Sequence, residues 1–352
     1  MKRFNNKLII IHDFDGRPYY KALESVDNVI FCNSRPFRFL LRDLIKHKKI
    51  SDDVLNSLLL LVFIPFIKRN KILIAMAPLN IRMILYSVLK YRNTVIYHSS
   101  WPHWGAYYPF SYGFLNKYLE IIWKKLLRTD YKIICVTKEA QKKLSLFINM
   151  KISDLSQIYH VVDCQEISKE CFERKWKDIN KLNVGFLGRI NESKGINEFI
   201  EIANNELLYS NVDFYAVGKG AMEDCITGSR NIDYLGFLSN RDDVRSYLSS
   251  LNFLLVPSKR NKYWEELFGV VIIEAMSQGV VVITTDHIGP KEIINSGNDG
   301  IILTEDEYVS TVIDILTIKD KECYSQVAFN AIVSSRKYSF DKIKNSWSDN
   351  VS

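Results

Sequence analysis

Two glutamates, Glu266 and Glu274, are separated by seven residues in the segment EELFGVVIIEAMSQG (265–279). The apolar residues before Glu274 predict a helix that begins near Gly269, packs inward and ends at Gly279. An ionised carboxylate is expensive to bury without a partner, so Glu274 must face either solvent or a ligand. It would lie about 7–9 Å along the helix axis, at about 1.5 Å per residue. Because the N–H groups at a helix start also bind phosphate, the segment predicts a site for both ends of a nucleotide-sized ligand.

A pair of cations, Arg189 and Lys194, follows the strand-like run Val184–Leu187. A guanidinium offers a planar fork of donors and an ammonium a point charge. Together they suit a diphosphate whose negative charge grows as a leaving group departs. The alternative is a strand-end loop with two solvated cations, but Gly195, which follows directly, favours the binding interpretation.

Three histidines in the first half of the chain are candidates for contact with a sugar. His98 follows the strand-like run Thr94–Tyr97, at the carboxyl edge where open α/β sheets bind ligands. His103 lies two residues after Trp101 in an aromatic segment that suits sugar stacking, and His12 ends the first strand-like run. For His98 and His103 the alternative is a histidine bonded to its own loop, and His12 is less diagnostic than either.

The elements that must position these residues are short apolar runs alternating with amphipathic stretches. In the first half, strands are expected at Lys7–Ile11, Asn28–Cys32, Ile72–Ala77, Thr94–Tyr97 and Lys132–Val136. Helices are expected between them at Phe37–Lys49, Asp52–Ile67, Ile81–Tyr91, Tyr112–Arg128 and Lys138–Phe147. The pattern resumes with strands at Val184–Leu187, Val212–Val217, Ile232–Leu235, Phe253–Val256 and Val280–Thr284. Runs without strict alternation are typical of a parallel sheet covered on both faces, so two Rossmann-like α/β domains facing across a cleft are predicted, residues 1–165 and 166–338.

The net charge of +7 is unevenly divided along the chain. Residues 1–180 hold 30 Lys and Arg against 16 Asp and Glu, whereas residues 181–352 hold 17 against 24. The most basic stretch, residues 35–49, interleaves six cations with Phe and Leu side chains, a pattern typical of a helix on an anionic membrane. A Rossmann helix with a basic outer face is the alternative. No recognition module for nucleic acid is found, so nucleic acid is not an expected partner.

The segment 265–279 resembles the donor-binding signature of the retaining GT-B glycosyltransferases, specifically glycosyltransferase family four. That signature is Glu, any residue, Phe-Gly, four residues, Glu-Ala-Met or Glu-Ala-Leu, a short gap and Gly. It is matched by Glu266, Phe268, Gly269, Glu274, Ala275, Met276 and Gly279. Further matches include Gly188–Ile190 with Lys194-Gly195, Val217–Gly220, Leu255–Ser258 and Thr284–Gly300. The resemblance covers the second half of the chain well and the first half only loosely.

The resemblance implies a role for each matched residue. Arg189 and Lys194 would bind the donor diphosphate, Glu274 would bind the ribose, and Glu266 would lie near the transferred sugar as a catalytic residue. For Glu266 the alternative is a first-turn acid favoured by the helix dipole, a place that Glu265 would fill equally well. The other expected donor contacts are Phe268, Gly269 and Val270 at the helix start, with Gly236 and Phe237 near the base.

In the first domain the resemblance directs His98 at the donor sugar as a second catalytic candidate, while His103, Trp101 and His12 are candidates for sugar or acceptor. The resemblance also implies that a last helix, about residues 339–352, crosses back to the first domain.

Residues 13–16, Asp-Phe-Asp-Gly, look like the D-x-D metal motif of the other large glycosyltransferase fold. Two carboxylates could hold a divalent ion on a diphosphate, but Arg189 and Lys194 already supply the positive charge. We therefore predict no metal site and interpret the segment as a turn in which Gly16 approaches the donor. Family members usually have a more glycine-rich loop here.

These features predict a retaining, metal-independent hexosyltransferase that uses a nucleotide diphosphate sugar, with UDP favoured, and no separate cofactor. The expected acceptor is a glycan, lipid-linked at the inner face of the cell membrane, in the biosynthesis of a surface polysaccharide such as capsule, O-antigen of lipopolysaccharide or exopolysaccharide. The longest apolar run, Leu58–Ile67, is too short to span a bilayer, and the start has no signal-peptide core. Six cysteines without zinc-like spacing indicate a reducing compartment. A cytoplasmic protein, peripheral to the membrane, is expected.

Three alternatives stay open. A GT-B nucleotide-sugar epimerase would need no acceptor site, and a non-catalytic subunit would bind the donor without turnover. A Rossmann oxidoreductase could use the turn Gly218-x-Gly220, although that turn lacks a third glycine and a downstream acid for the ribose.

Overall fold

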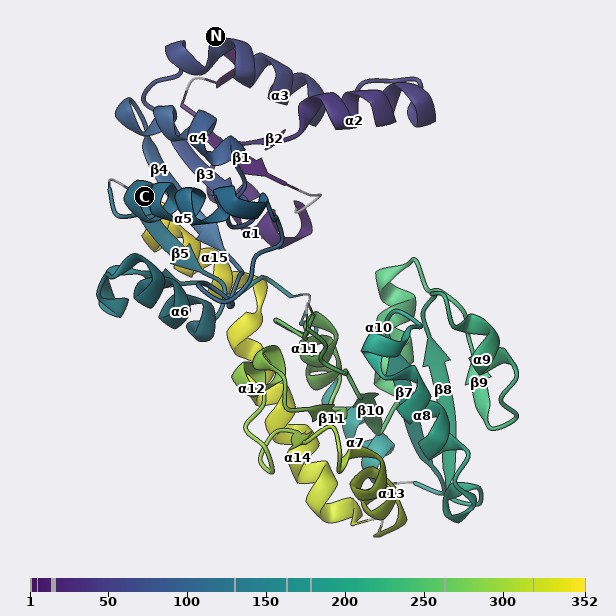
Figure 1. The fold of residues 1–352 in the computed structure, drawn as a ribbon. Helices are drawn as coiled ribbons and strands as arrows, with labels where there is room; N and C mark the ends of the chain where they lie inside the picture. The colour runs from purple at the N-terminus through teal and green to yellow at the C-terminus, as the bar shows by residue number, and fades with distance from the viewer. Residues whose placement is uncertain are drawn as a thin grey trace. The chain divides into compact units, whose positions relative to one another are not determined.

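The computed structural model describes residues 2–4, 6–13, 17–129, 131–162, 164–177, 179–262, 264–318 and 320–351. The chain divides into two compact units (Figure 1). Unit 1 is Met1–Val161 with Phe340–Ser352, and unit 2 is Val162–Ser339. Each unit is built on a six-stranded parallel sheet with helices between the strands. The predicted fold class, an α/β protein with two Rossmann-like domains of the GT-B type, is confirmed.

The sheet of unit 1 has the strand order β2-β1-β3-β4-β5-β6. Its strands are β1 (Leu8–His12), β2 (Val29–Asn33), β3 (Lys71–Ala75), β4 (Thr94–Ser99), β5 (Tyr131–Cys135) and β6 (Ser156–Gln157). The parallel register places His12 beside Asn33 on one side and Ala75 on the other. The residues that end these strands therefore share one edge of the sheet, as predicted for His12 and His98.

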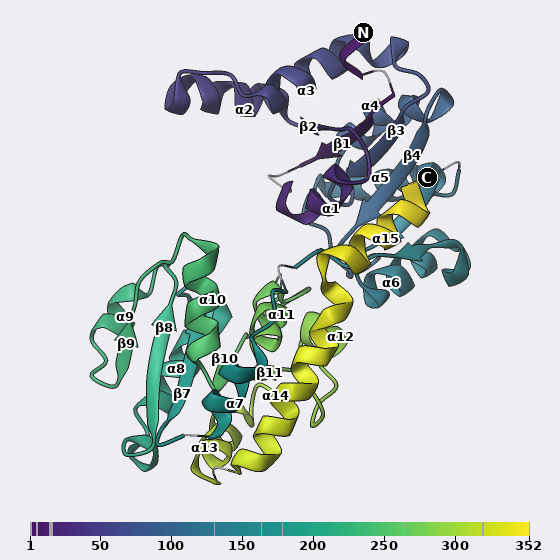
Figure 2. The ribbon, with the colours of Figure 1, turned by 180° about the vertical axis from the view of Figure 1, so that it is seen from behind.

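Helices cover both faces of this sheet, which explains its continuous apolar strands. The helices of unit 1 are α1 (Lys21–Glu24), α2 (Pro36–Arg42), α3 (Asp52–Phe63), α4 (Arg82–Tyr86), α5 (Asn116–Leu127), α6 (Lys138–Ile148) and α15 (Phe340–Val351). Buried side chains of α3, α4, α5 and α6 pack on the face that contains Ile9 and Ile11. Those of α1 and α15 pack on the opposite face, against Leu8 and Ile10, and Figure 2 shows α15 lying along the sheet.

The sheet of unit 2 has the strand order β12-β11-β10-β7-β8-β9. Its strands are β7 (Leu182–Leu187), β8 (Val212–Val217), β9 (Ile232–Tyr234), β10 (Phe253–Val256), β11 (Val281–Thr285) and β12 (Ile301–Leu303). Its helices are α7 (Lys169–Lys177), α8 (Ile196–Ala203), α9 (Glu223–Thr227), α10 (Arg241–Ser250), α11 (Val270–Ser277), α12 (Ile288–Ile293), α13 (Tyr308–Ile318) and α14 (Lys321–Ser335). The five predicted strands of this half are present, and β12 was not predicted.

Candidate functional site

The loops that follow β7, β8 and β10 touch one another through their backbones. Gly195 has φ +72°, and a Cβ atom there would lie 1.8 Å from the carbonyl oxygen of Pro257. Gly218 has φ +150°, and its Cβ would lie 1.8 Å from the carbonyl oxygen of Gly188. No side chain fits either contact, so glycine is required at both positions. These contacts fix the loop that carries Arg189 and Lys194 against its neighbours.

Lys194 and Glu266 form an ion pair between this loop and the loop after β10. Their side chains are only 19% and 15% exposed, and the Lys194 Nζ also lies 5.1 Å from the centre of the Trp264 ring. The structure therefore brings together the cation expected at the diphosphate and the carboxylate expected at the sugar. Arg189 is exposed on the same loop, and its side chain has no hydrogen bond or ion pair within the described part of unit 2.

Helix α11 begins at Val270, directly after Gly269, whose φ of +84° is costly for other residues. This confirms the predicted start of the helix. The amides of its first turn lack intrahelical acceptors, as at any helix start, and this turn contains no acidic residue. Phe268 is buried and packs edge-on against Tyr338, so its aromatic ring serves the core of unit 2.

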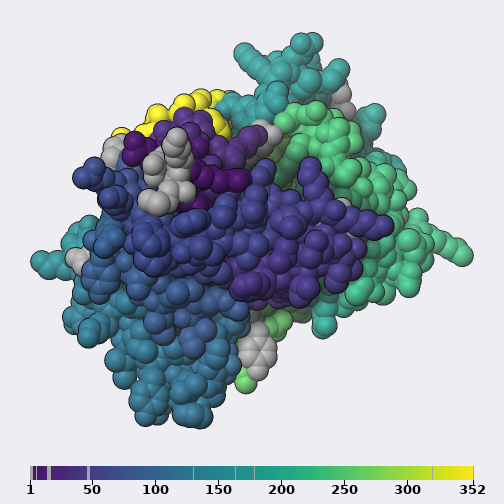
Figure 3. All heavy atoms as spheres, turned by 90° about the horizontal axis from the view of Figure 1, so that it is seen from above, coloured from purple at the N-terminus to yellow at the C-terminus, as the bar shows by residue number. Residues whose placement is uncertain are grey.

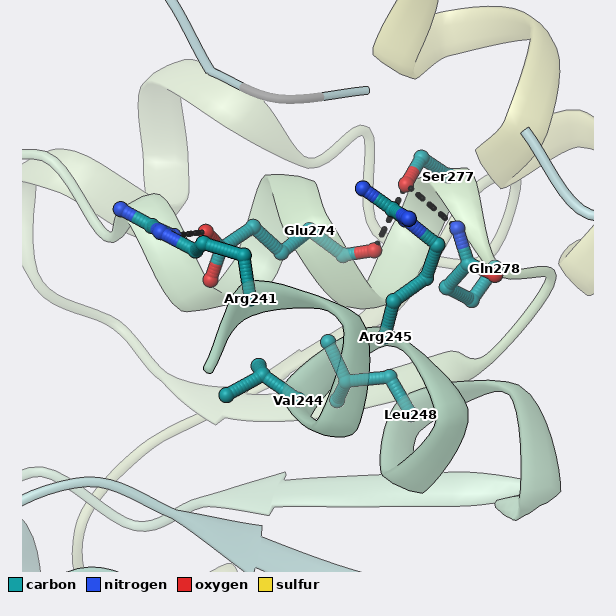
Figure 4. A pocket seen from close by; sticks show the side chains of 7 residues that line it. All are labelled: Arg241, Val244, Arg245, Leu248, Glu274, Ser277 and Gln278. Atoms are coloured by element: carbon teal, nitrogen blue, oxygen red, sulfur yellow. Dashed lines mark hydrogen bonds and ion pairs between the residues drawn. The ribbon is translucent and has the colours of Figure 1, made fainter. Parts of the chain in front are cut away.

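Glu274 lies on α11 and faces α10 (Figure 4). It is 9% exposed and forms an ion pair with Arg241, the first residue of α10, whose side chain is 62% exposed. The pocket around the pair is lined by Arg241, Val244, Arg245, Leu248, Glu274, Ser277 and Gln278. The sequence predicts that Glu274 faces either solvent or a ligand, whereas the structure pairs this buried carboxylate with Arg241, a residue that the sequence did not single out.

Gly236 and Phe237, the residues expected near the base, follow strand β9. The Gly236 carbonyl accepts a hydrogen bond of 2.9 Å from the Gly218 amide, and Gly236 has φ +71°. Phe237 is 57% exposed, and the Lys219 Nζ lies 4.2 Å from the centre of its ring. An exposed aromatic ring beside a cation is thus held at the loops after β8 and β9.

A buried histidine, His287, contacts the backbone of Glu266. Its Nδ1 accepts a hydrogen bond of 2.9 Å from the Glu266 amide, and its Nε2 lies 3.2 Å from the Glu305 carboxylate. Burial, reinforced by Arg260, lowers the pKa of His287. Sequence reasoning missed this residue, although its position after the apolar run 280–284 was a usable signal.

In unit 1, His98 is buried at the end of β4. Its Nδ1 shares a hydrogen bond of 2.8 Å with the Tyr20 hydroxyl, and its ring packs against Trp347 of α15. The Nε2 atom has no hydrogen-bond partner in the described part of the chain. Burial lowers the pKa of His98 to about 3, so the ring is neutral at physiological pH. His160, beside His98, also has a pKa of about 3 because of burial.

The other candidates of unit 1 form separate groups. His103 stacks on Tyr107 at 4.4 Å between ring centres and meets Trp101 edge-on at 5.5 Å. His12 is 4% exposed and packs edge-on against Phe31. The aromatic character expected around His103 is therefore present.

Asp13, the first acid of the D-x-D pattern, is buried and hydrogen-bonded to the chain itself. Its carboxylate accepts hydrogen bonds from the Ser34 hydroxyl, the Ala77 amide at 2.8 Å and the Asn80 side chain at 2.8 Å. These bonds tie together the segments after β1, β2 and β3. Asp15 and Gly16 lie outside the described residues. Across the residues that the structure describes, no three His, Cys, Asp or Glu side chains gather as a metal site would require.

The matched family model is described as "Glycosyl transferases group 1" and covers residues 181–317, within unit 2. A 2-deoxystreptamine N-acetyl-D-glucosaminyltransferase of Niallia circulans is 28% identical over 206 residues, 54% of this chain and 50% of the relative. The capsular polysaccharide biosynthesis glycosyltransferase CapM of Staphylococcus aureus is 29% identical over 160 residues, 39% of this chain and 40% of the relative. The chain thus spans about half the length of the curated relatives it matches.

Solved structures match over nearly the whole chain. HepE of Anabaena, crystallised with UDP, has a TM-score of 0.69 at 16% identity, over 98% of this chain and 99% of its own. A glycosyltransferase from Rickettsia africae has a TM-score of 0.68 at 15% identity, over 99% and 98% of the two chains. These likenesses concern the fold. They show that the chain has the GT-B fold, and the sequence matches show that unit 2 is similar to the group 1 glycosyltransferases, glycosyltransferase family four.

Proposed function

We propose that this protein is a retaining glycosyltransferase that transfers a hexose from a UDP-sugar to a glycan acceptor. The observation that carries the proposal is the ion pair of Lys194 with Glu266. Glu266 lies just before the start of α11, the helix that carries the buried carboxylate of Glu274. A cation and helix-start amides beside a carboxylate are the groups that a departing diphosphate and a developing positive sugar ring require. Two carboxylates alone would not distinguish a transferase from a structural ion-pair network.

We assign donor binding to residues 166–338 and acceptor binding to residues 1–165 with the last helix. In unit 2, Arg189 and Lys194 would hold the diphosphate, and Glu274 would hold the ribose. Glu266 would act at the transferred sugar, because its carboxylate is paired with Lys194, the cation that would bind the adjoining phosphate. UDP is preferred as the nucleotide, in line with the UDP bound by HepE.

His98 would be the residue of unit 1 that faces the reacting sugar. It is neutral, because burial lowers its pKa to about 3. A neutral imidazole with an unbonded Nε2 can donate or accept one hydrogen bond with a hydroxyl group. Trp101 and His103 would offer ring faces to the acceptor.

We further propose that the acceptor is lipid-linked and that unit 1 contacts the inner face of the membrane through residues 35–49. These residues fold as α2 followed by the π-helical turn η3 (Asp43–His47). Both lie on the side of unit 1 that faces the viewer in Figure 3. The apolar side chains of Phe37, Leu41 and Ile45 are 65%, 61% and 77% exposed. Exposed apolar side chains interleaved with cations are typical of an interfacial helix.

A second group of exposed apolar side chains supports this orientation. It comprises Ile84, Leu85 and Val88 of α4 and the turn after it, with Tyr118 and Ile121 of α5. A 2.7 Å hydrogen bond joins Lys90, in the turn after α4, to Thr129, two residues beyond the end of α5. No helix within the described residues is long and apolar enough to cross a bilayer, so contact at the surface is the form of association proposed. The pathway would be that of a surface polysaccharide, as for CapM.

A thermal-shift screen against UDP-, GDP- and ADP-sugars, followed by UDP-release assays with and without glycan acceptors, tests the function. We expect stabilisation by UDP and UDP-sugars, and turnover that Glu266→Gln lowers at least 100-fold, about the loss caused by removing one key transition-state group. Glu265→Gln, the matched control, should stay within threefold of wild type. Release of free UDP together with an epimerised free sugar, with no acceptor present and no transfer, would favour the epimerase instead. Binding without any turnover would favour a non-catalytic subunit.

A further inference from the structure

His287 is held in one protonation state by two hydrogen bonds. It lies between β11 and α12 with a fully buried side chain. Its Nδ1 accepts the Glu266 amide hydrogen at 2.9 Å, so this nitrogen carries no proton. The proton must then reside on Nε2, which faces a Glu305 carboxylate oxygen at 3.2 Å. The hydrogen-bond pattern therefore assigns the neutral Nε2–H tautomer to His287.

Glu305 is itself fixed in place. The same carboxylate oxygen accepts the Arg260 amide hydrogen at 3.0 Å, and the Arg260 guanidinium lies 3.7 Å away. Arg260 also binds Asp286 at 3.1 Å, and Asp286 binds Lys291 at 3.0 Å. The acceptor that selects the His287 tautomer is thus anchored to the loops after β10 and β11.

Residues 287–289, at the start of α12, hydrogen-bond to the peptide groups on both sides of Glu266, an arrangement that clamps its backbone. His287 accepts from the Glu266 amide, and the Gly289 amide donates to the Glu266 carbonyl at 2.9 Å. A Cβ atom at Gly289 would lie 2.5 Å from the Phe268 nitrogen, so the two backbones are in direct contact. With its backbone fixed, the Glu266 side chain is directed to Lys194.

We propose that His287 is a positioning residue: as the Nε2–H tautomer it fixes the backbone of Glu266 and thereby sets the carboxylate at the transferred sugar. The proposal rests on the proposed function of Glu266. The fully buried His287 side chain contacts the Glu266 amide, so it acts through Glu266. A displacement of about 1 Å in a reacting group costs up to about 100-fold in rate, which is the scale of effect expected here.

Protonation of His287 would break the clamp, because a charged imidazole carries N–H groups on both nitrogens and Nδ1 could no longer accept from Glu266. The charged groups around the ring are Arg260, Glu305 and Glu265, with Asp286 and Lys291 beyond them. Burial and Arg260 hold the pKa of His287 below its ordinary value, against the opposing effect of the two glutamates. The clamp is therefore intact at neutral pH and opens only on the acid side.

Nitrogen-15 NMR of the histidine rings in the full-length protein tests the clamp independently of any activity. We expect the His287 signal, assigned by its loss in His287→Asn, to show protonated Nε2 and unprotonated Nδ1 near pH 7.5. A Glu305→Gln variant should keep this tautomer, because the amide oxygen still accepts from Nε2. Predominant Nδ1–H, or rapid averaging of both tautomers, would overturn the proposal whether or not the protein is a transferase.

Kinetics then test the consequence for Glu266. His287→Leu should lower kcat about 10- to 100-fold while the Kd for UDP stays within threefold. In His287→Asn the side-chain oxygen can accept from the Glu266 amide, so most of kcat should return and the acid limb of the pH profile due to His287 should vanish.

Lys291→Met, at the outer end of the same network, is the control and should match wild type within twofold. If His287→Leu keeps full kcat, or if folded His287→Asn is as slow as His287→Leu, His287 does not position Glu266. If the wild-type protein shows no turnover, the proposed function is refuted but the hydrogen bond from the Glu266 amide to His287 is not, because the NMR experiment tests that bond without activity.

Discussion

Replacing Glu274 by Gln separates a donor-binding carboxylate from one that merely pairs with Arg241. The substitution keeps the shape of the side chain and removes its charge. Glu274 is 9% exposed, so bonds from a ribose diol to its carboxylate would form in a partly desolvated place. Hydrogen bonds to a charged group contribute about 1.5–3 kcal/mol. At about 1.4 kcal/mol per factor of ten, Glu274→Gln should weaken UDP binding about 10- to 100-fold.

Arg241→Gln is the matched control because it breaks the same ion pair from the other side. The Arg241 side chain is 62% exposed, and pairs of this kind contribute about 0–1 kcal/mol. Its effect on UDP affinity should stay within about fivefold. Isothermal calorimetry with UDP on the two variants and wild type gives the comparison. An unchanged Kd in folded Glu274→Gln would refute the assignment of Glu274 to the ribose, and equal losses in both variants would assign the effect to the ion pair.

Two further predictions concern the stability of the units. Gly195→Ala would place a Cβ atom 1.8 Å from the Pro257 carbonyl oxygen, so it should lower the free energy of unfolding by at least about 3 kcal/mol. Gly297→Ala is the control, because Gly297 has a similar φ with open space around it, and it should lower the free energy of unfolding by only about 1–2 kcal/mol. Equal losses of Tm in the two variants would show that the contact with Pro257 is unimportant. Burial lowers the pKa of His98 and His160 to about 3 in the folded protein, so on acidification these histidines bind protons first in the unfolded state. Their full contribution to the free energy of unfolding is therefore present above about pH 6.5 and is lost as the pH falls towards 3. Each histidine contributes up to about 4–5 kcal/mol to this loss. In urea denaturation, the free energy of unfolding of His98→Gln should fall less steeply with decreasing pH than that of wild type. An equally steep fall in both proteins would contradict a buried, neutral His98.

The sheet architecture was predictable from the sequence because buried parallel strands are short, continuous and apolar. Every predicted strand is present, with each bound within two residues of the prediction. β6, with two residues at a sheet edge, has too little pattern to be predicted, and β12 was also missed. The predicted helix 37–49 changes to a π-helical turn at Asp43, whose carboxylate binds Ser51, a local contact that apolar periodicity does not reveal.

The site was predictable only in its residue types. Lys194 and Glu266 were each expected at a donor, yet their ion pair joins residues 72 positions apart and follows from the packing of two loops. The partner of Glu274 and the role of His287 were missed for the same reason, because both depend on residues from other elements. Asp13 illustrates the opposite case. A suggestive D-x-D pattern begins with a carboxylate that hydrogen-bonds to residues following two neighbouring strands.

The measurement that tests the central claim most directly is the anomeric configuration of the sugar released or transferred from UDP-glucose, UDP-galactose and UDP-N-acetylglucosamine. Proton NMR at early times distinguishes the two anomers before they equilibrate. We predict that at least one of these α-linked donors is consumed and that the α-anomer forms first, with Glu266→Gln abolishing the signal. First formation of the β-anomer, or no consumption of any UDP-sugar by folded protein that binds UDP, would contradict a retaining UDP-sugar transferase.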